Sequence, residues 1–311
     1  SACKLLFNAT DMPFANYENS DAIAFNPHVE LPISDNKTVD LAIITDEISL
    51  DIDEALEEGK RLGFRKYELR CVDSYEHRVP YLNPGIEERL LSKIEKKEIE
   101  FTALTPGLFK IGLSDTDKIR REMEEALPKT CEMAKRLGAP RIIVFSFMKI
   151  DGGKREDALN LLKEAGQIAA QHNLQFSIEN EPGFFCDTGV NTAQFVKEIG
   201  AENVGINWDP ANALVSGEVA YPVGYDAVRP HLQNVHIKDA IPIPPDKWEN
   251  RLIGDGGVNW LGQLRALIND KPVDHLTLET HVFPVFEATR EDVRRLRILM
   301  DTVDAMNQSN D

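Results

Sequence analysis

The chain has 311 residues, 52 of them acidic and 35 basic. Its formal net charge of −17 argues against partners held mainly through phosphates, because nucleic-acid binding requires clustered Lys and Arg, and it disfavours an anionic membrane surface. With 42% hydrophobic residues but no run of about 18 apolar ones, the sequence predicts a globular protein and no membrane span.

Residues 1–38 differ in composition from the rest of the chain. They contain five Asn and three Pro and show no sustained hydrophobic period, which predicts an irregular extension or an arm wrapped on the body. We interpret His28, next to Pro27, as a solvent-facing loop residue. We expect a cytoplasmic location, although a start at Ser1 rather than Met leaves a removed targeting segment open.

From residue 39 onward, short apolar runs alternate with longer amphipathic stretches. The runs are rich in Ile, Val, Phe and Thr and are flanked by turn residues, a pattern typical of buried strands. Eight strands are predicted, at Val39–Ile48, Lys66–Val72, Glu100–Leu108, Arg141–Met148, Gln175–Glu181, Val204–Asp209, Asn234–Asp239 and His275–His281.

The segments between these runs carry the spacing of helices. Apolar residues recur every three to four positions over residues 158–169 and 119–137, and Pro128 should kink or divide the second of these helices. Thr289 and Asp292 resemble the capped start of the last helix. Left-handed glycines that end helices are predicted at Gly63, Gly138 and Gly200.

Eight strand–helix units of roughly 30 residues each predict an α/β fold, a (β/α)8 TIM barrel over residues 39–311, preceded by the irregular N-terminal extension 1–38. The alternative is an open doubly wound sheet, which would favour a Gly-rich phosphate loop after the first strand. The residues there are Thr45-Asp46-Glu47-Ile48-Ser49, and the chain has no Walker-type motif, so nucleotide binding through such loops is disfavoured.

The cysteines give no sign of a disulfide scaffold or a structural zinc site. They are scattered and form no CxxC pair, so we expect four unpaired thiols. The four are Cys3, Cys71, Cys131 and Cys186.

In a barrel of this kind, the active site lies at the carboxyl ends of the strands. Four consecutive strands, the fifth to the eighth, place an acidic or imidazole side chain at this level: Glu179, Asp209, His236 and Glu279. Three oxygen ligands and one imidazole suit Mn²⁺ or Mg²⁺, and Co²⁺ or Zn²⁺ stay open. A structural polar network is the alternative, but carboxylates without matching cations would repel one another.

The strand ends resemble the xylose isomerase-like TIM barrel superfamily, the sugar phosphate isomerase/epimerase group that also contains endonuclease IV. The resemblance covers about residues 39–300, and its order and spacing are specific to the superfamily rather than to one substrate. The matching strings are Ile43-Ile44-Thr45-Asp46-Glu47-Ile48, Tyr67-Glu68-Leu69-Arg70, Ile178-Glu179-Asn180, Trp208-Asp209-Pro210-Ala211-Asn212, Val235-His236-Ile237-Lys238-Asp239, Gly254-Asp255-Gly256 before Asn259-Trp260, and Leu278-Glu279.

The resemblance implies one divalent metal ion bound by Glu179, Asp209, His236 and Glu279. It also implies that Glu179 and Glu279 are catalytic. One carboxylate removes a proton from the carbon beside a carbonyl group, the metal stabilises the enediolate, and the other carboxylate returns a proton. The substrate is then a small carbohydrate-like molecule; we favour an unphosphorylated sugar, cyclitol or keto acid.

Six further side chains are candidates for substrate binding. Arg251 lies in the loop after the seventh strand, where similar enzymes use an arginine, and Lys238 follows His236 by two positions. Of Glu68 and Arg70, we expect only one to point into the barrel and choose Glu68. The remaining candidates are Glu181, Asn212 and His281.

Each of these candidates has a structural alternative. Arg251 or His281 could be a surface residue, Lys238 could pair with Asp239 on the surface, and Asn180 or Asn212 could cap a loop. Histidines that lie away from the strand ends are interpreted as structural: His77, His172, His231 and His275.

The favoured function is a metal-dependent isomerase or epimerase of a small polyhydroxy carbonyl compound. A dehydratase or lyase is the first alternative, because it shares the removal of the α-proton. An abasic-site endonuclease fits less well, since that activity needs more histidines and a basic surface, and Asn212 stands where it uses a histidine. A non-catalytic sugar-binding protein is the fourth reading, and a homo-oligomer stays open.

Overall fold

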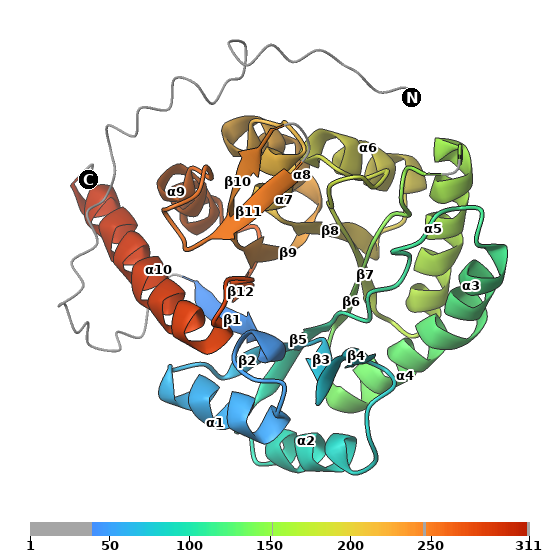
Figure 1. Ribbon diagram of the computed structural model, residues 1–311, viewed down its shortest axis with the longest axis horizontal. Helices are drawn as coiled ribbons and strands as arrows, with labels where there is room; N and C mark the ends of the chain where they lie inside the picture. The colour runs from blue at the N-terminus through green and yellow to red at the C-terminus, as the bar shows by residue number, and fades with distance from the viewer. Residues whose placement is uncertain (1–38, 151, 245–246, 310–311) are drawn as a thin grey trace.

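Eight parallel strands close into a barrel in the computed structural model, which describes residues 39–150, 152–244 and 247–309 (Figure 1). The predicted extension 1–38, with His28 and Cys3, lies outside the described residues. The barrel strands are β1 (Asp40–Ile44), β2 (Lys66–Leu69), β5 (Glu100–Leu104), β6 (Arg141–Val144), β7 (Gln175–Glu179), β8 (Val204–Trp208), β9 (Leu232–Ile237) and β12 (His275–Leu278).

The pairing of β1 shows that the sheet is closed. Asp40 of β1 is in register with His275 of β12, and Ala42 of β1 is in register with Lys66 of β2. The open doubly wound sheet is thereby excluded. All eight predicted strands are present, and each ends earlier than predicted. The predicted strands were too long because buried residues continue past the strand ends into the loops that form the mouth of the barrel.

Helices surround the barrel, and each strand is followed by at least one of them (Figure 1). They are α1 (Ile52–Arg61), α2 (Ile86–Glu95), α3 (Thr116–Arg121), α4 (Leu127–Leu137), α5 (Arg155–Gln171), α6 (Gly189–Ile199), α7 (Pro210–Val215), α8 (Tyr225–Val228), α9 (Trp260–Asp270) and α10 (Val285–Gln308). The predicted glycines follow α1, α4 and α6 with φ values of 87°, 72° and 66° at Gly63, Gly138 and Gly200.

Pro128 has the effect that was predicted. The helical segment after β5 is divided into α3, a π-helical turn at Glu122–Ala126, and α4, whose second residue is Pro128. Proline has no backbone N–H and its ring crowds the carbonyl four residues earlier, so a regular α-helix cannot continue through this position.

The predicted start of the last helix is wrong. α10 begins at Val285, directly after Pro284, so Thr289 and Asp292 lie inside the helix. Their side chains hold neighbouring loops instead of capping the helix. Thr289 Oγ1 donates to the carbonyl oxygen of Glu47 at 2.6 Å, and Asp292 Oδ1 accepts from the backbone N–H of Ile253 at 2.8 Å.

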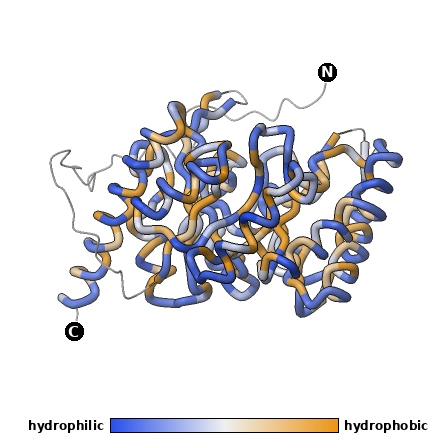
Figure 2. The backbone as a smooth tube through the Cα atoms, turned by 90° about the horizontal axis from the view of Figure 1, so that it is seen from below, coloured by the Kyte–Doolittle hydropathy of each residue, from blue (hydrophilic) through white to orange (hydrophobic). Residues whose placement is uncertain are grey.

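The apolar core fills the layer between the barrel and the helices. Phe176 on β7 is buried toward α5, where a Cβ on Gly166 would lie 2.7 Å from Val204 Cγ2. Such close approach of a helix to the sheet requires glycine at that position. Figure 2 shows the resulting alternation of hydrophobic and hydrophilic residues along the outer helices. No helix among the described residues is both long and apolar enough to cross a membrane.

Two short antiparallel hairpins stand at the carboxyl ends of the barrel strands. One follows β2 and consists of β3 (Cys71–Val72) and β4 (Ser74–Arg78), and the other follows β9 and consists of β10 (Asp239–Ile243) and β11 (Lys247–Arg251). Neither hairpin was predicted: Cys71–Val72 was included in the second strand, and Arg251 was placed in a loop. The hairpins matter for function because they form walls around the mouth of the barrel.

Candidate metal centre

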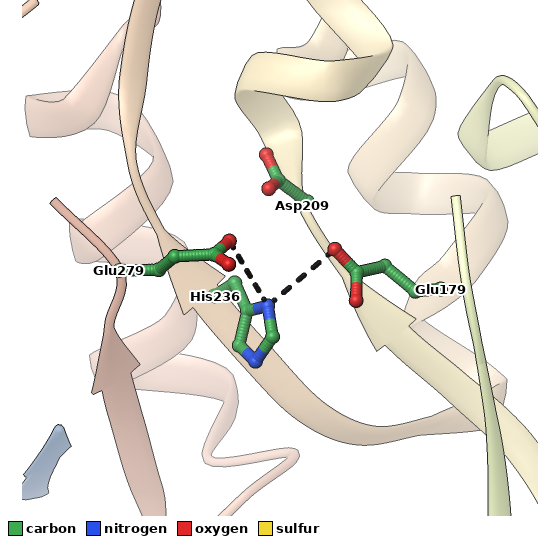
Figure 3. A group of neighbouring side chains, drawn as sticks. All are labelled: Glu179, Asp209, His236 and Glu279. Carbon is green, nitrogen blue, oxygen red and sulfur yellow. Dashed lines mark ion pairs between the residues drawn. The ribbon is translucent and has the colours of Figure 1, made fainter. Parts of the chain in front are cut away.

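The four side chains expected to bind a metal ion converge at the mouth of the barrel (Figure 3). Glu179 ends β7, Asp209 follows β8, His236 lies in β9 and Glu279 follows β12. All four are buried, and each offers one ligand atom within 4.8 Å of the others. His236 Nδ1 lies 3.5 Å from Glu179 Oε1 and 3.3 Å from Glu279 Oε2.

The start of α7 positions Asp209. As the N-cap of that helix, Asp209 uses Oδ1 to accept from the backbone N–H of Asn212 at 2.9 Å, and Pro210 occupies the first helical position. Asn180 clamps the same backbone, because its amide donates to the Asp209 carbonyl at 2.8 Å and accepts from the Asp209 N–H at 2.9 Å. The second carboxylate oxygen of Asp209 is left to face the site.

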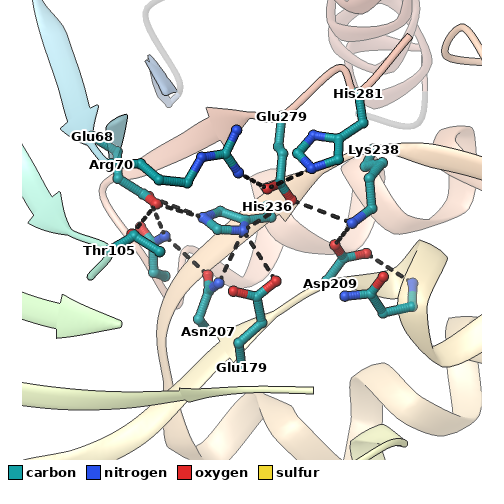
Figure 4. Close-up of polar contacts among 12 residues, drawn as sticks. Glu68, Arg70, Thr105, Glu179, Asn207, Asp209, His236, Lys238, Glu279 and His281 are labelled. Atoms are coloured by element: carbon teal, nitrogen blue, oxygen red, sulfur yellow. Dashed lines mark hydrogen bonds and ion pairs between the residues drawn. The ribbon is translucent and has the colours of Figure 1, made fainter. Parts of the chain in front are cut away.

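Glu68 sets the orientation of the His236 ring. His236 Nε2 lies 2.9 Å and 3.1 Å from the two oxygens of Glu68, so its N–H donates to this carboxylate and Nδ1 faces the other carboxylates (Figure 4). Glu68 is itself held, since Thr105 donates to Oε1 and Asn234 lies 3.4 Å from Oε2. A carboxylate behind a histidine ligand is a common arrangement at metal sites.

Positive side chains are interleaved with the acidic ones. Lys238 Nζ lies 2.7 Å from Asp209 Oδ2 and 3.3 Å from Glu279 Oε2, and Arg70 Nη1 donates to Glu279 Oε1 at 2.6 Å. Arg70 also donates to Asp46 and Glu47, each at 2.8 Å. The cluster is thus a nearly buried network of opposite charges rather than a solvated surface patch.

These contacts shift the pKa values of the site. Burial acts to raise the pKa of Glu279, but the nearby Lys238, His281 and His236 outweigh it, and the pKa lies well below its usual range. Burial raises the pKa of Asp209, against the attraction of Lys238. Burial acts to lower the pKa of His236, yet the carboxylates of Glu68, Glu179 and Glu279 hold it well above its usual value.

The donor set fits a divalent cation. Three carboxylates and one imidazole surround one point, the imidazole presents Nδ1 to that point, and Glu68 keeps the ring in place. A metal ligand must be neutral imidazole, so a bound cation would replace the proton that the carboxylates otherwise favour on His236. An oxygen-rich set suits Mn²⁺ or Mg²⁺ and also accepts Co²⁺ or Zn²⁺.

A neighbouring acidic group is neutralised by the protein itself. Glu47, Glu279 and His281 could also hold a cation by spacing alone, but Arg70 donates to both of these carboxylates. His281 Nδ1 lies 2.6 Å from Glu47 Oε1. Burial acts to raise the pKa of Glu47, but His281 and Arg70 lower it to about 2.

A cavity of ≈ 330 Å³ opens above the four residues. Glu179 and Glu279 lie in its floor. Exposed aromatic side chains from β4, from β11 and from the loop before α10 line its entrance: Tyr75, Trp248 and Phe283. A volume of this size is at the small end of the range for ligand pockets, so it suits a small molecule.

The structure places four of the predicted substrate-binding residues in the cavity wall: Lys238, Glu181, Asn212 and His281. Asn212 Nδ2 donates to Glu181 Oε2 at 3.0 Å, which orders the wall between α7 and the end of β7. The alternative role of Asn212 in holding a loop is also present, because Asn212 Nδ2 donates to the carbonyl oxygen of Asn180 after β7 at 2.9 Å.

The other two candidates lie elsewhere. Arg251 is outside the cavity wall, because Trp248 and Asn250 of β11 face the cavity, so Arg251 points away and pairs with Glu249 at 2.9 Å. Glu68 is fully buried beneath the cavity, against His236.

The expectation that only one of Glu68 and Arg70 points inward is wrong. Side chains two positions apart lie on the same side of a strand, and both contact the site. The sequence reading missed Arg70 for this reason. It also missed Asp46 and Glu47 of the turn after β1, although their position at a strand end was a usable signal.

His275 and three of the cysteines are found as the sequence predicted. His275 is buried, with Nε2 2.8 Å from Asn234 Oδ1, and belongs to a polar network inside the barrel, as a structural residue should. Cys71, Cys131 and Cys186 are buried free thiols.

Comparison with known proteins relates this geometry to a family. The model of the xylose isomerase-like TIM barrel family matches residues 56–299. The 3-dehydroshikimate dehydratase of Bacillus anthracis is 27% identical over 161 residues, which are 49% of this chain and 54% of the relative. The match therefore spans about half the length of that curated relative.

Solved structures of low identity share the fold. A D-tagatose 3-epimerase-like protein has a TM-score of 0.70 at 17% identity, with 86% of this chain and 99% of that chain covered. A xylose isomerase-like TIM barrel protein from Mycobacterium smegmatis, solved in complex with magnesium, has a TM-score of 0.64 at 14% identity, covering 86% and 98%. The chain belongs to the xylose isomerase-like TIM barrel family, as the resemblance predicted.

Proposed function

We propose that this chain is a divalent-metal-dependent isomerase or epimerase of a small polyhydroxy carbonyl compound. The observation that carries the proposal is the convergence of Glu179, Asp209, Glu279 and His236 Nδ1 in the floor of a small cavity. The four would hold one divalent ion, which would polarise the substrate carbonyl and stabilise the negative charge that develops on it.

Of the two glutamates, we assign the role of proton acceptor to Glu179 because its side chain has fewer positive neighbours. Among the described residues, the Glu179 side chain forms an ion pair only with His236. The Glu279 side chain is contacted by Arg70, Lys238 and His281. Positive partners hold Glu279 in its ionised form, which makes it the weaker base. Glu179 then removes the proton beside the carbonyl group. Glu279 passes a proton to the other side of the substrate from protonated His281, whose Nε2 lies 3.6 Å from Glu279 Oε1 and whose pKa is raised because Glu279 and Glu47 outweigh burial.

Other side chains bind and orient. Lys238 bridges Asp209 and Glu279 and fixes both carboxylates at the floor of the cavity. Asn212 and Glu181 offer an amide and a carboxylate in the wall, groups that can hydrogen-bond the hydroxyls of a sugar or cyclitol. The aromatic side chains at the entrance limit access of water to a bound substrate.

A dehydratase or lyase is the second candidate, and the match to a 3-dehydroshikimate dehydratase favours it. Such an enzyme removes the same kind of α-proton and then expels a β-leaving group. Glu179 would keep its role as base, and a proton passed from His281 through Glu279 would reach the leaving group.

Exchange of substrate hydrogen in deuterated water tests the proposal. The Mn²⁺-loaded protein is incubated with a panel of ketoses, cyclitol ketones and hydroxy keto acids, and we expect deuterium at the carbon beside the carbonyl group. Glu179→Gln should abolish it, while Glu202→Gln, which changes an exposed carboxylate before β8, should not. Unchanged exchange in Glu179→Gln, or no exchange with any compound, would refute the proposal.

A further inference from the structure

Among the residues that the structure describes, one cation in the cavity wall has no partner. Four Lys and Arg side chains line the cavity among the described residues, and three of them are paired with carboxylates: Arg70 with Glu279, Lys110 with Glu181 at 3.0 Å, and Lys238 with Asp209. The fourth, Arg78, has no side-chain hydrogen bond or ion pair within the described part of the chain.

The backbone around Arg78 is shaped to hold its guanidinium in the wall. Arg78 ends β4 and packs against the loop after β5, where Gly107 has a φ of 74°. A Cβ on Gly107 would lie 3.0 Å from Arg78 Nη1 and 3.5 Å from its Cζ. The glycine therefore makes room for the guanidinium, which lies partly buried against the loop.

The net charge of the chain indicates what kind of substrate Arg78 could attract. A formal net charge of −17 repels anions at long range, so an anionic substrate needs a local attraction inside the cavity. The other three cations are committed to the acidic groups of the site, so one positive charge is available, enough for a singly charged anion. A guanidinium matches a carboxylate with two parallel hydrogen bonds.

We propose that Arg78 binds a carboxylate group of the substrate, and that the substrate is a polyhydroxylated carboxylate rather than a neutral sugar. The proposal rests on the function proposed above, because it concerns the same cavity. It assigns Arg78 to specificity: the carboxylate is held at the β3–β4 hairpin, and the reacting carbon lies at the floor beside Glu179.

Binding of a matched pair of ligands tests the proposal without any turnover. Shikimate carries one carboxylate on a ring with several hydroxyls, and its methyl ester is the neutral counterpart. Their affinities for the full Mn²⁺-loaded chain are measured by calorimetry in wild type, Arg78→Met and Arg78→Lys. Arg65→Met serves as the control, because it removes an exposed Arg just before β2, at the opposite end of the barrel strands.

We expect wild type to bind shikimate at least about tenfold more tightly than the ester, as a charge-assisted pair implies. Arg78→Met should lose that preference and keep its affinity for the ester, Arg78→Lys should retain part of the preference, and Arg65→Met should match wild type. Circular dichroism establishes that each variant is folded. If Arg78→Met does not fold, Arg78→Lys still tests the proposal.

Three results would overturn the proposal: equal affinities of wild type for the two ligands, an equal loss of both affinities in Arg78→Met, or no binding of shikimate by wild type. Failure of the proposed function has a different signature. In that case deuterium exchange is absent with every compound tested, while the preference for shikimate still depends on Arg78.

Discussion

Glu68 is not among the proposed metal ligands, but it holds one of them, His236, in place. It is fully buried and contacts Nε2 of His236, which leaves Nδ1 directed at Glu179 and Glu279. A hydrogen bond from the distal nitrogen to a carboxylate fixes the tautomer of a histidine ligand and makes it a stronger donor.

Replacing Glu68 with Gln should therefore weaken metal binding about 10- to 100-fold, because the neutral amide keeps the shape but loses the charge that supports the ring. Titration of the metal-free protein with Mn²⁺ measures the effect, with Glu202→Gln as the control for loss of one carboxylate. Equal affinities of Glu68→Gln and wild type would show that the contact is only structural.

Lys238 supplies positive charge to the same site from the other side. Its ammonium lies 2.7 Å from Asp209 and 3.3 Å from Glu279, and its side chain is almost completely buried. Removing one partner of a buried ion pair leaves the other charge uncompensated.

Lys238→Met should destabilise the metal-free protein by about 3–5 kcal/mol. Saturating Mn²⁺ should raise the free energy of unfolding of the variant by more than it raises that of wild type, because the cation neutralises the same carboxylates. Urea unfolding with and without Mn²⁺ provides the comparison. A loss of the same size under both conditions would mean that Lys238 acts by packing rather than by charge.

At the residue scale, the four proposed ligands could be named from the sequence because each stands at the end of a regular strand. The walls of the cavity could not. Arg251 is separated from the cavity by the pleat of β11, and that strand has no clear signal in its sequence, Lys247–Arg251. Arg70 could also have been predicted, because side chains two positions apart on a strand lie on the same side and Glu68 points into the barrel.

At the scale of elements, α10 and the loop after β11 are joined through a buried carboxyl group. Asp292 Oδ1 accepts from the backbone N–H of Ile253, and burial raises the pKa of Asp292 to about 7. The unfolded chain should have the ordinary pKa of about 3.9. Between these values the folded protein holds a proton that the unfolded chain releases, so this residue makes the protein less stable as the pH rises.

Asp292→Asn should remove that dependence. Relative to the variant, the free energy of unfolding of wild type should fall by up to about 4 kcal/mol between pH 4 and pH 7 and then stay level. Urea unfolding of both proteins over this range gives the difference directly. A constant difference across the range would contradict the raised pKa.

The elements themselves were predictable to different degrees. Most residues of the eight barrel strands are buried, so their sequences are mainly apolar runs that stand out from the amphipathic helices. The start of α10 was misplaced because Thr289 and Asp292 look like a cap, while their side chains are used to hold Glu47 and Ile253. The role of these two residues depends on contacts with distant parts of the chain, which a local sequence pattern cannot predict.

At the scale of the whole molecule, the barrel brings together residues that are far apart in the chain. Arg70 and Glu279 are 209 positions apart and form a 2.6 Å contact only because β1 pairs with both β2 and β12. Closure also gathers part of the negative charge, Glu179, Asp209 and Glu279, into one buried cluster. In a chain with a net charge of −17, these three carboxylates form a buried cluster suited to the proposed metal ion, which the total charge does not reveal.

The metal content of the purified protein tests the central claim most directly. After removal of metals and dialysis against Mn²⁺, elemental analysis should find one ion per chain in wild type. Asp209→Asn combined with His236→Gln should hold none, while remaining folded by circular dichroism. Tight binding of three zinc ions per chain would favour the nuclease branch of the superfamily, and one ion retained in the double variant would show that these four side chains are not the metal centre.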